Sequence, residues 1–172
     1  MPTLTLPRKD QVKDYALGVA LLPLCALFAF GEYVYDPNPL IFVVHAFDLI
    51  VHEAGHFFFG FFGQTMEIAG GSLFQLILPA LFVYQGIYWN NRAGTQLSLL
   101  LLGQNFVDVS IYAADAQARA LPLLGGDRVF HDWHVILANL GMLDAAPVVA
   151  GVLYGLAFVA WALMLAVPRW IL

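Results

Sequence analysis

The chain has 172 residues, of which 61% are hydrophobic and only 11% are charged. Soluble domains are about half apolar and about a quarter charged, so this chain has too few polar side chains to cover a surface in water. Its net charge of −5 excludes a nucleic-acid partner, and its hydrophobicity excludes intrinsic disorder. The composition therefore predicts an all-α, polytopic integral membrane protein, a helical bundle in contact with membrane lipid.

Apolar stretches separated by turn residues predict about five transmembrane helices in a single membrane domain, at about 15–30, 39–62, 73–89, 95–114 and 147–168. The second span is expected to begin with Asn38 as N-cap and Pro39 at the first helical position. Gly70-Gly71-Ser72 is expected to break the chain before the third span. The segment 115–146 is more polar and is expected to lie at the membrane interface.

Five spans would put the two termini on opposite sides of the membrane. Lysine and arginine favour the cytoplasmic side, and an arrangement with the N-terminus inside places five of the seven there, namely Arg8, Lys9, Lys13, Arg119 and Arg128, with Arg92 and Arg169 outside. We therefore expect a multi-pass protein with a cytoplasmic N-terminus, in the cytoplasmic membrane if the source is bacterial.

The second span contains His52-Glu53-Ala54-Gly55-His56, the H-E-x-x-H pattern. On an α-helix, residues i and i+4 share one face, so both imidazoles can bind one metal ion with the glutamate beside it. A carboxylate costs about 2.5 to 3.5 kcal/mol at the centre of a membrane helix on insertion scales, so chance is a poor explanation. The pattern predicts a Zn²⁺ site with His52 and His56 as ligands and Glu53 as a general base.

The same helix carries further polar residues. Asp48 lies one turn before His52, where it is expected to accept the imidazole N–H that the metal does not use; satisfaction by another buried donor is the alternative. His45 lies two turns from His52, too far to share one ion, so a supporting, proton-transfer or structural role is expected. Gly55 removes a side chain where another helix or a substrate could approach.

A catalytic zinc usually has three protein ligands and one open position. Asp108 is the only carboxylate well inside the fourth span and is the first candidate for the third ligand. Its rival is His131, in the segment after that span, and Asp127 and His134 remain open. Asp132 could orient one of these two histidines.

Gln104 and Asn105 share the helix face of Asp108. They are expected to support the metal site or to contact a substrate. Hydrogen bonds between helices are the alternative.

An H-E-x-x-H pattern in a membrane span, followed two spans later by a helix with Asn105 and Asp108, resembles the site-2 protease class of intramembrane zinc metalloproteases. The resemblance covers the second span and the general order of the helices. It implies that His52 and His56 bind zinc, that Glu53 is the catalytic base, and that an aspartate of a later span, matched by Asp108, completes the site.

These observations predict a zinc-dependent intramembrane metallopeptidase-like hydrolase that cuts a membrane protein or a single-span peptide. The alternative is a non-proteolytic metal-binding membrane protein that acts as an accessory subunit of a complex or as a chaperone for a client helix. A third interpretation, haem or di-metal ligation by the five histidines, lacks a haem-attachment motif.

Overall fold

The computed structural model describes residues 9–124 and 130–171, and every regular element in these ranges is helical. In chain order the helices are α1 (Lys9–Ala20), α2 (Leu22–Phe30), α3 (Pro39–Gly60), α4 (Gln64–Tyr88), α5 (Arg92–Ala114), α6 (Asp132–Asn139) and α7 (Ala146–Ala166). Four described segments are long and apolar enough to cross a membrane: α3, α4, α5 and Leu143–Arg169. The predicted all-α membrane bundle is therefore confirmed.

The first predicted span, 15–30, forms two helices. α1 ends at Ala20 and α2 begins at Leu22, with Pro23 in the first turn of α2. Because proline has no backbone N–H and fixes its own φ angle, it is tolerated at the start of a helix but not in the middle of one. The apolar part of this pair, Asp14–Phe30, is shorter than the four long spans.

α3 begins as the sequence predicts. Asn38 is the N-cap, and its side-chain Oδ1 accepts a hydrogen bond of 3.0 Å from the backbone N–H of Leu40. Pro39 occupies the first helical position, where its missing N–H would have had no partner in the helix.

The prediction that Gly70-Gly71-Ser72 breaks the chain is wrong. α4 begins at Gln64 and continues through these residues to Tyr88. The glycines serve close packing instead: a Cβ atom on Gly70 would lie 2.6 Å from the Cβ of Phe59 and 2.7 Å from the carbonyl oxygen of Gly55. The turn before α4 is made by Gly63, whose φ of +97° favours glycine.

α5 is the central helix of the bundle. In its most apolar 18-residue stretch, 56% is buried inside the protein. The corresponding share is 22–28% in the other three long segments. It packs closely on α7, where the side chain of Trp161 lies over Gly103 and donates a hydrogen bond of 3.1 Å from Nε1 to the carbonyl oxygen of Leu100. Polar side chains of α5 therefore face protein rather than lipid.

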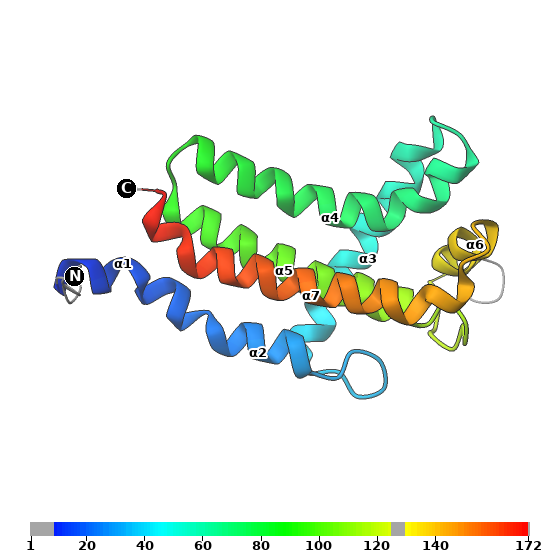
Figure 1. Cartoon of the computed structure of the whole chain (residues 1–172), viewed down its shortest axis with the longest axis horizontal. Coiled ribbons are helices and arrows are strands. Elements are labelled where there is room, and N and C mark those ends of the chain that lie inside the picture. The colour runs from blue at the N-terminus through cyan, green and yellow to red at the C-terminus, as the bar shows by residue number, and fades with distance from the viewer. Residues whose placement is uncertain (1–8, 125–129, 172) are drawn as a thin grey trace, which may run out of the picture.

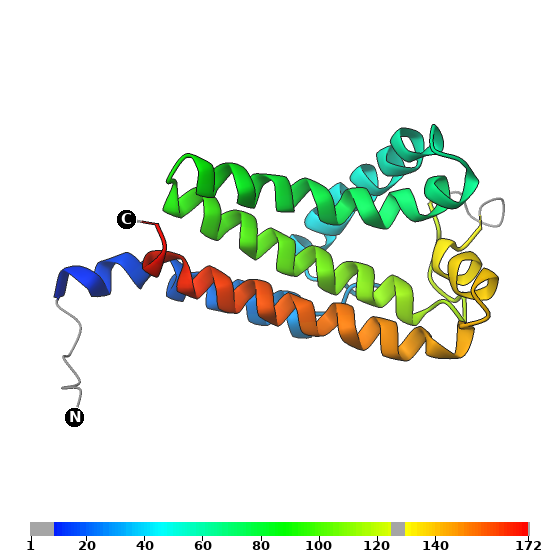
Figure 2. The same cartoon turned by 45° about the horizontal axis from the view of Figure 1, so that its top comes forward.

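α4, α5 and α7 run side by side, whereas α3 slants across them (Figures 1 and 2). The connections at both ends of α3 lie toward the end of the bundle where α5 finishes. At the opposite end, Arg92 at the start of α5 donates hydrogen bonds to Asp14 of α1 and to the carbonyl oxygen of Ile171. The described beginning and end of the chain therefore share one end, which differs from the expectation that five spans separate them.

Candidate metal centre

His52, His56 and Asp132 form the one group of three metal-ligating side chains found among the described residues. Oδ2 of Asp132 lies 2.9 Å from Nε2 of His52 and 3.3 Å from Nε2 of His56. A tetrahedral zinc ion with bonds of about 2.0 Å separates its ligand atoms by about 3.3 Å. Both distances to Oδ2 of Asp132 are therefore close to the spacing that one zinc ion requires, and all three ligand atoms lie within 4.8 Å of one another.

The two histidines have their other ring nitrogens occupied by acceptors. Nδ1 of His52 donates to Oε1 of Gln75 at 3.2 Å, and Nδ1 of His56 donates to the backbone oxygen of Glu67 at 2.8 Å. The orientation of the Gln75 amide is fixed because its Nε2 donates to the carboxylate of Asp108 at 2.6 Å. Carbonyl acceptors of this kind hold metal-binding histidines in the required tautomer and ring orientation.

In these tautomers both Nε2 atoms carry a lone pair rather than a hydrogen. Two lone pairs and a carboxylate oxygen then converge on one point, and such an arrangement repels itself unless a cation lies among the three groups. The cation is either protons on the imidazoles or a metal ion. The donor set of two imidazoles and one carboxylate is one that catalytic zinc uses.

Asp132 is carried to this point by α6, which lies outside the long spans. Its backbone N–H donates to the hydroxyl of Tyr112 on α5 at 3.0 Å, and the Trp133 indole donates to Ser72 on α4 at 3.1 Å. Burial alone would raise the pKa of the Asp132 carboxyl. When the Nε2 atoms carry protons, hydrogen bonds from His52 and His56 outweigh burial and hold that pKa below its usual range.

Two glycines let α4 approach the H-E-x-x-H turn of α3. A Cβ atom on Gly71 would lie 2.4 Å from Nε2 of His52, so any larger residue there would displace the imidazole. A Cβ on Gly55 would lie 2.3 Å from the carbonyl oxygen of Gly70. The expectation that another helix approaches at Gly55 is confirmed.

A cavity of about 800 Å³ opens beside the three side chains. Glu53 is exposed and lines it together with His52, His56 and Asp132. Apolar residues form much of the remaining wall, including Pro37 before α3 and the stretch 121–124 after α5. No lysine or arginine is among the described lining residues.

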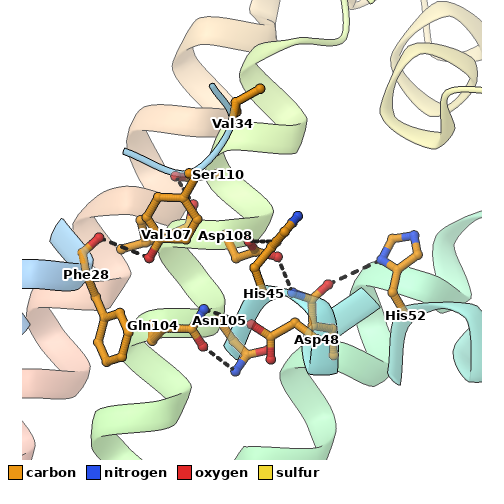
Figure 3. Close-up of polar contacts among 12 residues, drawn as sticks. Phe28, Val34, His45, Asp48, His52, Gln104, Asn105, Val107, Asp108 and Ser110 are labelled. Atoms are coloured by element: carbon orange, nitrogen blue, oxygen red, sulfur yellow. Dashed lines mark hydrogen bonds and ion pairs between the residues drawn. The ribbon is translucent and has the colours of Figure 1, made fainter. Parts of the chain in front are cut away.

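A second polar cluster lies deeper in the bundle, where α3 crosses α5 (Figure 3). Nδ1 of His45 lies 2.6 Å from Oδ1 of Asp108, and the other oxygen of Asp108 accepts from Gln75. Asp48 accepts from Nε2 of Gln104 at 2.7 Å, and Oε1 of Gln104 accepts from Asn105 at 3.1 Å. A continuous chain of contacts thus links His45 through Asp108 and Gln75 to His52 (Figure 3).

The structure brings together some of the predicted site residues and separates others. Asp108 lies with His45 and Gln75 and is not in the three-residue group, which Asp132 completes. His131 is directed elsewhere: its Nε2 lies 3.2 Å from Asp115, and its Nδ1 accepts from the backbone N–H of His134.

The other predicted residues have separate positions. His134 lies against the carbonyl oxygen of Ala116. Asp48 was expected to support His52 or to be satisfied by another buried donor; the second alternative holds, because Asp48 accepts from Gln104. Gln104 and Asn105 are buried and are not among the described lining residues of the cavity. Asp127 lies outside the described residues.

Gln75 contacts His52 and Tyr112 contacts Asp132, and the sequence did not link either residue to the metal group. Both are polar residues inside predicted spans, which is a signal of function in a membrane helix, but nothing in the pattern shows which neighbour each one meets. Asp132 carried a clearer signal because it follows a histidine and precedes an apolar helix.

No protein-family model matches this chain, and no curated protein or solved structure gives a match.

Proposed function

We propose that this protein is a zinc-dependent intramembrane hydrolase that cleaves peptide bonds, with His52, His56 and Asp132 as the zinc ligands. The observation that carries the proposal is the convergence of two imidazole nitrogens and a carboxylate oxygen on one point, with the other nitrogen of each ring facing a carbonyl acceptor. When bound there, zinc would polarise a substrate carbonyl and acidify a water molecule.

Glu53 is the general base of this proposal. It precedes Ala54 and Gly55 within the turn that carries both histidines, and its side chain faces the same cavity as Asp132. Within the described residues no hydrogen bond or ion pair occupies its carboxylate. A carboxylate free to accept the proton of an attacking water and to pass it to the leaving amine is the group that peptide hydrolysis requires.

The cavity favours an apolar substrate segment. Its walls are mostly hydrophobic side chains, and its carboxylates, with no described lysine or arginine beside them, offer no partner for an anionic substrate. A membrane-helix segment that unwinds into the cavity fits this chemistry. The H-E-x-x-H pattern within a membrane span, which resembles the site-2 protease class, supports the same assignment.

The distribution of cations supports an orientation. Lys9, Lys13, Arg92 and Arg169 lie on elements that meet at one end of the bundle (Figure 1), while among the described residues only Arg119 lies at the other end. Since cytoplasmic ends of membrane proteins are enriched in lysine and arginine, the N-terminal end faces the cytoplasm. The metal group, near the opposite end, then opens toward the outer side.

The function is tested with Glu53→Gln. Purified wild type and variant are analysed for zinc by mass spectrometry, and both are co-expressed with a library of single-span peptides whose cleavage is read by mass spectrometry. We expect equal zinc content and a loss of cleavage of about 10²- to 10⁴-fold in the variant. Asp144→Asn, a carboxylate-to-amide change outside the cavity, is the control and should cleave like wild type.

Two results would contradict the proposal. Absence of stoichiometric zinc in wild type would remove the metal site. Equal zinc binding with no cleavage by wild type, together with a co-purifying membrane partner, would replace the hydrolase with the accessory-subunit function.

The orientation is tested separately by labelling intact cells with a membrane-impermeant maleimide. In a Cys25→Ser background, Asp36→Cys reports the end of the bundle that holds the cavity, and Asn90→Cys reports the other end. We expect labelling at position 36 only; labelling at position 90 only would reverse the orientation.

A further inference from the structure

We propose that His45, held by Asp108, is a second binding point in the cavity and that it takes a backbone amide group of an extended peptide about 10 Å from the metal ligands. The inference rests on the proposed function, because it supplies the subsite that an unwound substrate needs. His45 and Asp108 belong to the second polar cluster, which is separate from the three side chains of the metal group.

The position of His45 is set by the helix that also carries the metal ligands. His45 precedes His52 by seven residues on α3, which corresponds to about 10.5 Å at 1.5 Å per residue. Both residues line the same cavity. An extended peptide advances about 3.3 Å per residue, so His45 faces the part of a bound chain that lies about three residues from the bond at the metal.

One ring nitrogen of His45 has a hydrogen-bond partner and the other is available to a ligand. Nδ1 contacts Asp108 at 2.6 Å, and the side chain is 33% exposed. Nε2 points away from Asp108 by the geometry of the ring, and it has no hydrogen-bond partner among the described residues. Whether this nitrogen accepts or donates, a peptide backbone offers the matching N–H or C=O group.

A hydrogen bond from His45 to a substrate backbone would be favourable because the surroundings are apolar. A helix that unwinds in an apolar cavity exposes backbone N–H and C=O groups, and each unsatisfied group costs several kcal/mol in hydrocarbon. Much of the cavity wall is built from side chains such as Val34, Phe42 and Leu49, which cannot hydrogen-bond. His45 is a polar group of this cavity with a ring nitrogen left to satisfy the backbone, whereas the side chains of Gln75 and Asp108 already share hydrogen bonds.

Asp108 makes His45 a rigid binding point rather than a mobile one. Its two oxygens are shared between His45 and Gln75, so the imidazole is oriented by a carboxylate that is itself held in place. A purely structural pin between α3 and α5 would need no exposed ring nitrogen and no access to the cavity. The exposed edge of His45 is what distinguishes a binding group from such a pin.

The test measures binding and does not depend on turnover. The probes are N-acetyl peptide hydroxamates with one to four leucines, whose hydroxamate group binds zinc, and their affinities for zinc-loaded protein in detergent are measured by calorimetry. For wild type we expect affinity to rise by roughly three- to tenfold when the chain becomes long enough to reach position 45, the value of one hydrogen bond. His45→Leu should lose this step, and His45→Gln, which keeps an amide near the position of Nε2, should restore most of it.

The outcomes separate the inference from the proposed function. If the one-leucine probe binds but His45→Leu keeps the length-dependent step, or weakens all probe lengths equally, His45 is a structural residue and the inference is overturned. If no probe binds the zinc-loaded protein, the metal cavity itself is not a peptide site, and the proposed function fails with it. N-methylation is applied to the probe amide that lies opposite His45. If His45 accepts a hydrogen bond from this N–H group, methylation removes the length-dependent rise in affinity; if His45 donates to a carbonyl group, the rise remains.

Discussion

Replacing Asp132 by asparagine should weaken zinc binding more than replacing Asp108 by asparagine. The reason lies in the geometry: Oδ2 of Asp132 lies 2.9 and 3.3 Å from the two imidazole nitrogens, whereas Asp108 reaches His52 only through Gln75. Asp132 would be a direct ligand and Asp108 a positioning residue. Both substitutions keep the size of the side chain, so they compare chemistry rather than packing.

The magnitudes follow from these two roles. Structural zinc sites bind with about 10 to 16 kcal/mol over four ligands, or about 2.5 to 4 kcal/mol per ligand, so losing Asp132 should cost roughly 10²- to 10³-fold in affinity. Loss of an outer partner of a zinc-binding histidine typically costs about 10- to 100-fold. Asp108→Asn belongs in that lower range, because an asparagine cannot accept from both His45 and Gln75 and so releases the orientation of the Gln75 amide.

The assay is competition for zinc between detergent-purified protein and a fluorescent chelator of known affinity. Gln75→Met should behave like Asp108→Asn, because it also removes the acceptor for Nδ1 of His52. Asp144→Asn serves as control and should bind zinc like wild type. A larger loss in Asp108→Asn than in Asp132→Asn would refute the ligand assignment and would restore Asp108 as the third ligand.

Three further substitutions test contacts at the site and elsewhere in the bundle. Gly71→Ala should abolish zinc binding, measured by metal content, because its Cβ would fall 2.4 Å from Nε2 of His52, while Gly151→Ala, with nothing within 4 Å of its Cβ, should leave the metal content unchanged. Gly103→Ala should lower the free energy of unfolding by about 1 to 3 kcal/mol, seen as a lower midpoint of thermal unfolding in detergent, because its Cβ would meet the Trp161 ring at 2.2 Å; an unchanged midpoint would show that this helix contact adapts freely. Arg92→Gln should speed amide hydrogen exchange both in α1 around Asp14 and near Ile171, and an effect at one of them alone would contradict the shared contact.

The sequence predicted the fold class because membrane helices leave a direct compositional signal. Long charge-free stretches, with a capped start at Asn38 and Pro39, are sufficient to identify helices whatever their neighbours are. The error at Gly70 and Gly71 arose because glycine has two uses, to break a helix and to let two helices touch. Which use applies depends on whether α3 packs against these glycines, and the sequence around them does not show where α3 lies.

The pairing of polar groups was less predictable than their identity. The sequence marked Asp48 and Asp108 as functional candidates because carboxylates are costly in a membrane. Helix periodicity put Asp48 beside His52 and left another buried donor as the alternative, because the partner that a side chain meets depends on which helix crosses its face. Here α4 crosses α3 beside His52 and supplies Gln75, and α5 supplies Gln104 to Asp48.

The slant of α3 explains why the third metal-ligating side chain of the group lies outside the long spans. If α3 ran alongside α5, the fourth span would be the natural source of a carboxylate, as the resemblance to an intramembrane protease implies. Because α3 crosses obliquely (Figure 1), its first half meets α5, where His45 finds Asp108, and its second half has moved on to α4. The space beside His52 and His56 is then reached from the end of the bundle, by α6 with Asp132 at its first position. One helix thus presents polar groups to two different buried carboxylates, Asp108 of α5 and Asp132 of α6, and both carboxylates line the cavity.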